Sequence, residues 1–197
     1  MGDSHHIPEG IPGDFSEGIP EGVLIGVSLA VPEPYASLVQ NARTGYGDRR
    51  AAGIPTHITL LPPTSVPTGA LDAIDGHLVR AAEQHRPFRV RLHGTETFRP
   101  VSQVVYVRLD EGIAECRALE ASVRSGPLAR ELGFPYHPHV TVAHDLPPAE
   151  LDRAQAELRG FDAEFTVDGF SLYRFGADEV WRPVRTFAFT TAARATR

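Results

Sequence analysis

The chain has 197 residues, of which 42% are hydrophobic and 22% are charged, which is ordinary for a globular protein and long enough to bury a core without disulfides or a structural metal. Its net charge of -6 argues against a nucleic-acid partner if that charge is spread evenly. Cys116 is the only cysteine, which excludes an internal disulfide, and no apolar stretch approaches the roughly 18 residues that cross a bilayer. We therefore expect a cytoplasmic protein that carries no signal peptide and makes no membrane contact.

The first 22 residues differ from the rest. They contain EGIP twice, and their density of Pro and Gly suits neither a helix nor a central strand, so residues 1–22 are predicted to form a flexible arm and residues 23–197 a single domain. The arm holds five acidic residues and no Arg, so the remainder carries 20 acidic residues against 19 Arg, a net charge of -1. A nearly neutral body does not exclude a phosphate substrate, although it weakens the case for a long polyanion.

Hydrophobic periodicity predicts alternating strands and helices along the body. In chain order, the patterns predict a strand at 23–31, a helix from Pro34 with Tyr35, Leu38, Val39 and Ala42 on one side, a loop at 44–53, a strand at 57–61 ended by Pro62 and Pro63, and an amphipathic helix at 70–85. They continue with strands at 88–98 and 104–109, a helix at 112–132 broken at Gly126-Pro127, a strand at 138–143, a helix at 149–159, and strands at 165–175 and 185–191.

An internal repeat is present in this order of elements. Each half runs strand, helix, strand, Pro-rich turn, helix, strand, and the segment HITL at 57–60 has its counterpart in HVTV at 139–142, 82 positions later. A further match is between Phe-x-Val at 88–90 and Phe-x-Val at 165–167. The repeat predicts two similar lobes that are related by a pseudo-two-fold axis and place equivalent residues face to face.

The two H-x-T-x segments carry the chemistry that we expect. Alternate residues of a strand share a face, so His57 and Thr59 point to one side, as do His139 and Thr141, while the residues between them enter the core. A neutral imidazole can take a proton from an attacking hydroxyl or water, and a protonated imidazole can give one to the leaving oxygen. Threonine hydroxyls can donate hydrogen bonds to phosphate oxygens. The set suits phosphodiester chemistry without a metal.

The paired motifs resemble those of the two-histidine (2H) phosphoesterase superfamily, which includes the 2′-5′ RNA ligase-like proteins and RNA 2′,3′-cyclic phosphodiesterases. The resemblance covers about residues 23–191 and includes the last hairpin, SLYRFGADEVWRPVRTFAF. It implies a bilobal α+β fold with two antiparallel sheets and the active cleft between them, His57 and His139 as the acid/base pair, and Thr59 and Thr141 as phosphate-binding residues. It also implies that the reaction needs neither metal nor ATP.

The same resemblance implies a substrate class. Members of the superfamily open 2′,3′-cyclic phosphates, and some join or split 2′-5′ linkages, so we expect RNA ends or small cyclic nucleotides as substrates and a monomeric enzyme. Which histidine is the acid is left open. The alternative is a non-catalytic RNA-end or nucleotide-binding protein on the same scaffold, although binding alone would not need matched imidazoles.

A metal-dependent hydrolase is a third hypothesis. His137, His139 and His144 lie close together in YHPHVTVAH, and two histidines on one strand face can bind a metal ion. Pro138 separates the first two, and no carboxylate or cysteine follows at a ligand spacing. We therefore expect no metal site, and an exposed loop position for His137.

Several other residues could have either a structural role or a functional one. Tyr136 could stack on a base or cap the cleft, but packing is the default. Arg43, Arg49 and Arg50, with Tyr46, could bind a phosphate and a base, but solvated loop charge is the default.

Four single residues complete the set of candidates. Arg174 and, to a lesser degree, Arg99 occupy matching points of the repeat, so either could reach the phosphate. Trp181 is expected to pack within the last hairpin, and Cys116 to lie in the core rather than act as a nucleophile.

Overall fold

The computed structural model describes residues 22–191, so the predicted arm lies outside the described residues except for Gly22, which begins the first strand. The strands are β1 (Gly22–Ala30), β2 (His57–Pro67), β3 (Phe88–Thr97), β4 (Val104–Glu111), β5 (His139–His144), β6 (Asp162–Val167), β7 (Gly169–Phe175) and β8 (Trp181–Ala188). The helices are α1 (Tyr35–Gly45), α2 (Leu71–Glu83), α3 (Ile113–Val123) and α4 (Pro148–Glu157). None of these helices is long and apolar enough to cross a membrane.

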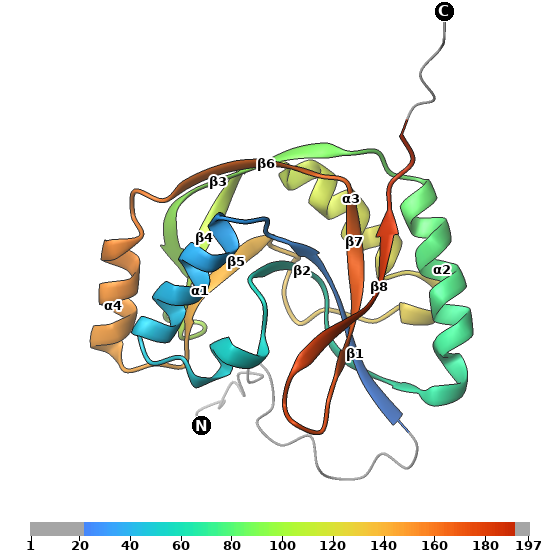
Figure 1. Cartoon of the computed structure of the whole chain (residues 1–197), viewed down its shortest axis with the longest axis horizontal. Coiled ribbons are helices and arrows are strands. Elements are labelled where there is room, and N and C mark those ends of the chain that lie inside the picture. The colour runs from blue at the N-terminus through green and yellow to red at the C-terminus, as the bar shows by residue number, and fades with distance from the viewer. Residues whose placement is uncertain (1–21, 192–197) are drawn as a thin grey trace, which may run out of the picture.

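The strands form two four-stranded antiparallel sheets, in the orders β2-β1-β7-β8 and β5-β4-β3-β6. We call the first sheet, with α2 and α3, the first lobe, and the second sheet, with α1 and α4, the second lobe (Figure 1). The predicted bilobal α+β fold is confirmed.

The two lobes are intertwined. Strand β3 follows the first motif in sequence but pairs with β4 of the second sheet, and β7 follows the second motif but pairs with β1. Helices cross over in the same way, because α1 contacts β5 and α3 contacts β2 (Figure 1). Each motif strand is therefore supported by a helix from the other half of the repeat, which keeps the lobes in a defined relation.

The predicted strand at 165–175 is in fact two strands in two sheets. It divides at Asp168, where β6 of the second lobe ends and β7 of the first lobe begins. Gly169 permits the crossing, because a Cβ at this position would lie 2.5 Å from the carbonyl oxygen of Phe187 on the neighbouring strand. The repeated Phe-x-Val segments pair with each other, since Phe88 lies opposite Val167 in the ladder between β3 and β6.

The prediction that Pro62 and Pro63 end a strand is wrong. Strand β2 continues to Pro67, and the two prolines lie in a bulge, because Leu61 pairs with Val27 while Thr64 pairs with Ile25. Proline has no backbone N–H to donate to a neighbouring strand. An edge strand or a bulge has positions at which no donor is required. Since β2 is an edge strand of its sheet, both conditions are met.

Two helix boundaries also differ from the prediction. Helix α1 continues to Gly45, so the first residues of the expected loop at 44–53 are helical, and a 3₁₀ turn spans Arg49–Gly53. Helix α3 ends at Val123 rather than continuing to residue 132, and Gly126–Leu128 forms a separate 3₁₀ turn. Gly126 has a φ of 54°, a left-handed conformation that a continuous helix does not contain. The break predicted at Gly126-Pro127 therefore follows the end of the helix rather than interrupting it.

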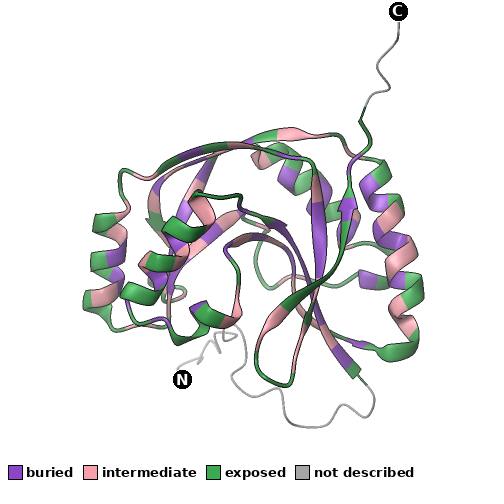
Figure 2. Ribbon diagram, in the orientation of Figure 1, coloured by how far each residue is buried: buried purple, intermediate pink, exposed green. Residues whose placement is uncertain are grey.

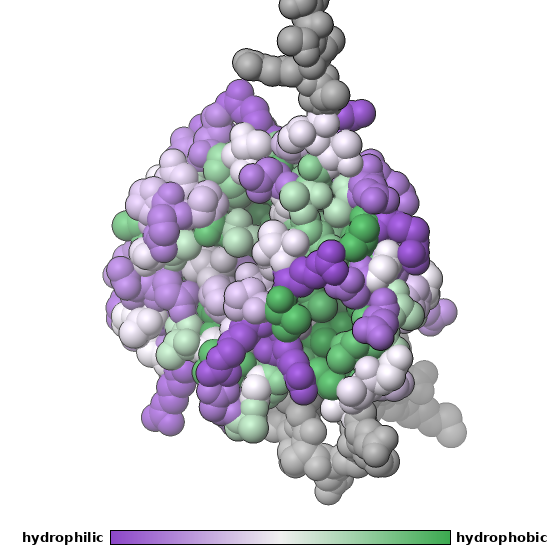
Figure 3. All heavy atoms as spheres, turned by 45° about the vertical axis from the view of Figure 1, so that its right-hand side comes forward, coloured by the Kyte–Doolittle hydropathy of each residue, from purple (hydrophilic) through white to green (hydrophobic). Residues whose placement is uncertain are grey.

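The hydrophobic core fills the space between each sheet and its helices. Buried residues recur along the strands of both sheets and along one side of α2 and α3, and exposed residues lie on the outer side of these helices (Figure 2). On the face that carries α2 and β8, hydrophobic side chains gather in a patch bordered by hydrophilic ones (Figure 3). Full burial of a Leu or Ile side chain stabilises a fold by about 1.5–3 kcal/mol, so this core holds the motif strands firmly.

Candidate active site

The two motif strands, β2 and β5, contact each other across the boundary between the lobes. In each strand the motif His and Thr are partly accessible, whereas Ile58, Leu60, Val140 and Val142 are at most 1% exposed. The predicted alternation is therefore confirmed. The buried residues anchor each strand, and the His and Thr side chains lie on the opposite face of their strand.

Both motif histidines are held by the same local hydrogen bond. His57 Nδ1 lies 2.6 Å from the carbonyl oxygen of Pro55, and His139 Nδ1 lies 2.7 Å from that of His137. A carbonyl oxygen can only accept, so Nδ1 of each ring carries a proton. In the neutral ring Nε2 is then the nitrogen with a free lone pair, and it lies at the far end of the imidazole from the strand backbone.

The two threonines differ in their contacts. The Thr59 hydroxyl lies 3.1 Å from His57 Nε2, to which it donates when the imidazole is neutral. The Thr141 hydroxyl is accessible and makes no hydrogen bond within residues 22–191. One hydroxyl is therefore already engaged with its histidine, and the other is available to an incoming oxygen atom.

Burial lowers the pKa of both histidines. The pKa of His139 falls to about 4, mainly because burial disfavours the charged ring, with smaller contributions from His137, His57 and His144. Burial also lowers the pKa of His57, and the nearby Arg43 guanidinium acts in the same direction. The charge of a protonated His57 is among the smaller causes of the lowered pKa of His139. Near neutral pH both are uncharged in the free protein.

The residues beside the two motifs differ between the lobes. In the first lobe, Ala30 pairs with His57 and Ser28 pairs with Thr59. At the equivalent positions of the second lobe, Arg108 pairs with His139 and Tyr106 pairs with Thr141. Directly paired residues of neighbouring strands point to the same face, so small side chains flank the first motif and large ones flank the second.

An aromatic cluster surrounds His139. Its ring centroid lies 5.0 Å from that of Phe98, 5.2 Å from that of Tyr106 and 6.3 Å from that of His137. Tyr106, Arg108 and Phe98 were not assigned to the site on sequence grounds. The alternation in VVYVRL was the available signal, because it places Tyr106 and Arg108 on the strand face opposite to that of Val105 and Val107, although Tyr106 is itself 3% exposed.

Tyr136 connects the two motifs. Its hydroxyl donates a hydrogen bond of 2.9 Å to the carbonyl oxygen of Thr59, and burial raises the pKa of its phenol. The side chain is partly buried against the core, so the packing interpretation holds for most of the ring.

The arginine-rich segment does not have either of its predicted roles at Arg43. This side chain is buried, and it forms an ion pair of 2.8 Å with Asp48. Arg50 lies at the surface, 3.9 Å from Asp145. Tyr46 is buried and donates to Glu157, with a hydrogen bond of 3.0 Å. The segment is thus structural at Arg43 and Tyr46, because Arg43 joins α1 to the residues that flank the 3₁₀ turn and Tyr46 binds to α4.

The remaining candidates differ in their contacts. Arg99 is bound to α4 by an ion pair of 2.8 Å with Asp152, whereas Arg174 forms no ion pair within residues 22–191. Trp181 packs against Phe175 with ring centroids 5.1 Å apart, as expected for the hairpin. Cys116 is fully buried, and burial raises the pKa of its thiol to about 12, which confirms a core role.

A metal centre finds no support in the arrangement of side chains. Within residues 22–191, no three His, Cys, Asp or Glu side chains are grouped as metal ligands. His144 lies 3.2 Å from Asp145, beside the Arg43–Asp48 pair, while His137 packs edge-on against Phe98. His144 is therefore apart from the other two histidines of YHPHVTVAH, whereas His137 and His139 both pack against Phe98 and Tyr106.

Comparison with known proteins agrees with this geometry. A family model described as the 2'-5' RNA ligase superfamily matches residues 31–179. A curated protein of Bacillus cytotoxicus, named "Putative phosphoesterase", is 31% identical over 142 residues, which cover 71% of this chain and 82% of that protein. A protein of the same name from Geobacillus kaustophilus is 28% identical over 164 residues, which cover 82% and 94%.

Solved structures share the fold. Escherichia coli LigT, crystallised with NADP+, has a TM-score of 0.61 at 20% identity, covering 87% of this chain and all of LigT. TT0787 of Thermus thermophilus has a TM-score of 0.58 at 25% identity, covering 84% and 97%. Both likenesses extend over the two lobes.

Proposed function

The chain belongs to the 2'-5' RNA ligase superfamily of 2H phosphoesterases, and from this membership we propose that it is a metal-independent phosphodiesterase acting on 2′,3′-cyclic phosphates or 2′-5′ linkages. Its substrates are RNA ends or small nucleotides. The observation that carries the proposal is the matched orientation of His57 and His139, each held through Nδ1 by the carbonyl oxygen two residues earlier. Binding alone would not require two imidazoles that are held in the same way through Nδ1.

In the proposed reaction, one neutral imidazole accepts a proton from water through Nε2 while the water oxygen attacks phosphorus. The bond between phosphorus and the leaving ribose oxygen breaks, and the second imidazole, protonated, donates its Nε2 proton to that oxygen. The products are a phosphomonoester and a free hydroxyl. Thr141, and Thr59 once its hydroxyl turns from His57, donate to the non-bridging oxygens as charge accumulates there.

The low pKa of the histidines is compatible with this scheme. Both rings are neutral in the free protein, so one is ready to act as the base. A bound phosphodiester carries a negative charge, which stabilises an adjacent imidazolium and raises its pKa. Substrate binding therefore supplies the protonated partner that the leaving oxygen requires.

A nucleotide substrate is supported by the fold relatives and by the charge of the body. Structures of E. coli LigT were solved with 3'-AMP, NADP+ and ATP. The net charge of -1 outside residues 1–22 favours a short nucleotide held at one phosphate over a long polyanion.

A substrate panel with product identification tests the proposal. We expect hydrolysis of nucleoside 2′,3′-cyclic phosphates by protein that has been exhaustively treated with a chelator. Chromatography against 2′- and 3′-phosphate standards would identify which bond breaks, and 2′-5′-linked dinucleotides would test the second substrate class. Saturable binding of these compounds without turnover would favour the non-catalytic alternative. Activity that chelation removes and added metal restores would contradict the metal-independent scheme.

A further inference from the structure

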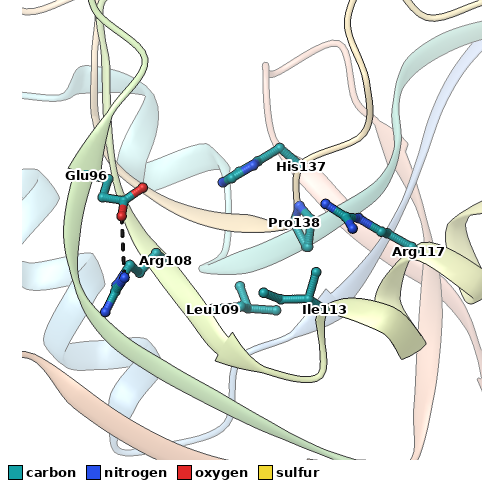
Figure 4. A pocket seen from close by; sticks show the side chains of 7 residues that line it. All are labelled: Glu96, Arg108, Leu109, Ile113, Arg117, His137 and Pro138. Atoms are coloured by element: carbon teal, nitrogen blue, oxygen red, sulfur yellow. Dashed lines mark ion pairs between the residues drawn. The ribbon is translucent and has the colours of Figure 1, made fainter.

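A pocket of about 170 Å³ lies beside the second motif (Figure 4). Its lining consists of Glu96, Arg108, Leu109, Ile113, Arg117, His137 and Pro138. Three of these residues adjoin the proposed catalytic histidine, because His137 and Pro138 immediately precede His139 and Arg108 pairs with it across the sheet. A molecule whose phosphate sits at His139 therefore has its next chemical group within reach of this pocket.

The pocket combines apolar and polar lining residues. Leu109, Ile113 and Pro138 lie together on one side, and Glu96, Arg117 and His137 surround them (Figure 4). Small-molecule sites typically combine an apolar surface with a few polar groups that fix orientation. At about 170 Å³ the space is well below that of a typical drug-sized site, so it suits one heteroaromatic ring system rather than a whole nucleotide.

Arg117 is the polar group that is free to bind. Arg108 is already occupied, since it donates to the carbonyl oxygen of His93 at 2.9 Å and forms ion pairs with Glu96 and Asp110. Arg117 forms neither a hydrogen bond nor an ion pair within residues 22–191. Its guanidinium extends from α3 towards Pro138 and the interior of the pocket (Figure 4).

We propose that this pocket holds the nucleobase of the substrate, with the base against Leu109, Ile113 and Pro138 and the Arg117 guanidinium stacked on it or donating to its edge. The inference rests on the proposed function. Guanidinium planes and apolar side chains commonly hold unstacked bases in this manner. A second phosphate fits less well, because an apolar surface does not compensate for its desolvation and Arg108 is already paired with Glu96 and Asp110.

Within residues 22–191, the residues that pair with the two motifs differ between the lobes. At the position that corresponds to Arg108, which lines the pocket, the first lobe has Ala30, whose side chain is too short to form a comparable wall. The pseudo-two-fold symmetry of the motifs is therefore broken at the residues beside them. This difference would orient a nucleotide with its base in the second lobe.

The test compares substrates that share the cyclic phosphate and differ in the base. Steady-state kinetics would be measured with the four nucleoside 2′,3′-cyclic phosphates, with 1-O-methylribose 2,3-cyclic phosphate, which has no base, and with its 5-phosphorylated derivative. Arg117→Ala is expected to raise KM about tenfold for the nucleotides with little change in kcat, as for the loss of one charged contact, and to leave both base-free compounds unchanged. Arg80→Ala is the matched control, because Arg80 is also an exposed helical arginine without an ion pair within residues 22–191.

Each outcome decides the matter. An unchanged KM for the nucleotides, or an equal change for the base-free compound, would overturn the pocket assignment and leave the phosphodiesterase proposal intact. A change confined to compounds with a 5-phosphate would identify an anion site instead. If the parent protein hydrolyses none of the compounds, the proposed function is wrong. Calorimetry with guanosine 3′-phosphate and ribose 3-phosphate then tests whether the pocket binds a base. The pocket assignment would be supported if the parent bound guanosine 3′-phosphate more tightly than ribose 3-phosphate and Arg117→Ala abolished this difference. Equal binding of the two compounds by the parent would overturn the assignment.

Discussion

The Tyr136 hydroxyl donates a hydrogen bond of 2.9 Å to the carbonyl oxygen of Thr59, so the segment that leads into the second motif is attached to the backbone of the first. The two motifs are 82 residues apart in sequence, and β2 and β5 belong to different sheets. This contact therefore helps to set the position of one histidine relative to the other. Acid/base catalysis by a pair depends on such positions, because an ångström of displacement can reduce the rate substantially.

We expect Tyr136→Phe to lower kcat by about tenfold and to lower the free energy of unfolding by about 1 kcal/mol, the net contribution of one hydrogen bond. Kinetics and urea denaturation would measure the two effects. The control is Tyr46→Phe, which removes the bond from Tyr46 to Glu157 between α1 and α4. That variant should lose comparable stability without losing kcat. An equal loss of kcat in both variants would show that Tyr136 acts only through general stability.

Replacement of either motif histidine should remove most activity. We expect His57→Ala and His139→Ala each to lower kcat by about 10²–10⁴-fold, the usual contribution of a general acid or base. His85→Ala serves as the control, because His85 is bound to Ser122 at 3.0 Å on the side of α2 and α3, away from β2 and β5. Hydrolysis of a 2′,3′-cyclic nucleotide at the parent rate by either motif variant would contradict the two-histidine scheme.

The free hydroxyl of Thr141 gives a separate prediction. Thr141→Val preserves the shape of the side chain and removes the donor, so we expect kcat to fall by about 10²-fold while KM changes little, because the hydrogen bond strengthens as charge develops on phosphorus-bound oxygen. Thr95→Val is a suitable control, since the Thr95 hydroxyl donates to the carbonyl oxygen of Gln155 on the far side of β3. A change in KM alone would assign Thr141 to substrate binding only.

The pH dependence of kcat/KM should be a bell whose maximum lies below pH 6.5. The reaction requires one neutral and one protonated histidine, and burial lowers both pKa values in the free protein, that of His139 to about 4. Above the higher of these two pKa values the acid is lost, so kcat/KM should fall about tenfold per pH unit. The profile of kcat should lie at higher pH, because the bound phosphodiester stabilises the imidazolium.

These profiles would be measured from pH 4 to pH 9 in buffers of constant ionic strength, with far-ultraviolet circular dichroism to confirm that the protein stays folded. A level kcat/KM between pH 5 and pH 8 would contradict paired acid/base catalysis by groups of lowered pKa.

The buried ion pair between Arg43 and Asp48 predicts a large effect on stability. Both side chains are 5% exposed, and Asp48→Ala would leave the guanidinium buried without its partner, which typically costs about 3–5 kcal/mol. The control is Asp178→Ala, because the pair between Asp178 and Arg182 is more than half exposed and such pairs contribute about 0–1 kcal/mol. Urea denaturation would measure both. Equal effects would contradict the structural role assigned to Arg43.

Much of the fold could be predicted from local patterns. The alternation in the H-x-T-x segments correctly placed Ile58 and Val140 in the core, and the helical period of 70–85 matches α2. The errors occurred where distant segments decide the outcome. The bulge at Pro62-Pro63 depends on pairing with β1, and the division at Asp168 depends on which sheet each strand joins.

The candidate site shows the same division. Residue type and spacing singled out His57, Thr59, His139 and Thr141, and these remain a proposal that the variants above would test. The burial of Arg43 could not be predicted, because the sequence does not show that Asp48 and the carbonyl oxygen of Ile54 enclose its guanidinium.

The repeat, the family and the face of each strand on which the motif side chains lie all follow from the order of amino acids, because a period of two residues is a local property of an extended chain. The neighbours of each motif follow only from the folded chain. Arg108 and Tyr106 flank His139 and Thr141, whereas Ala30 and Ser28 flank the first motif, because strand register is set by hydrogen bonds between segments far apart in the chain. A repeat that is nearly symmetric in sequence thus folds into a site with two chemically different sides.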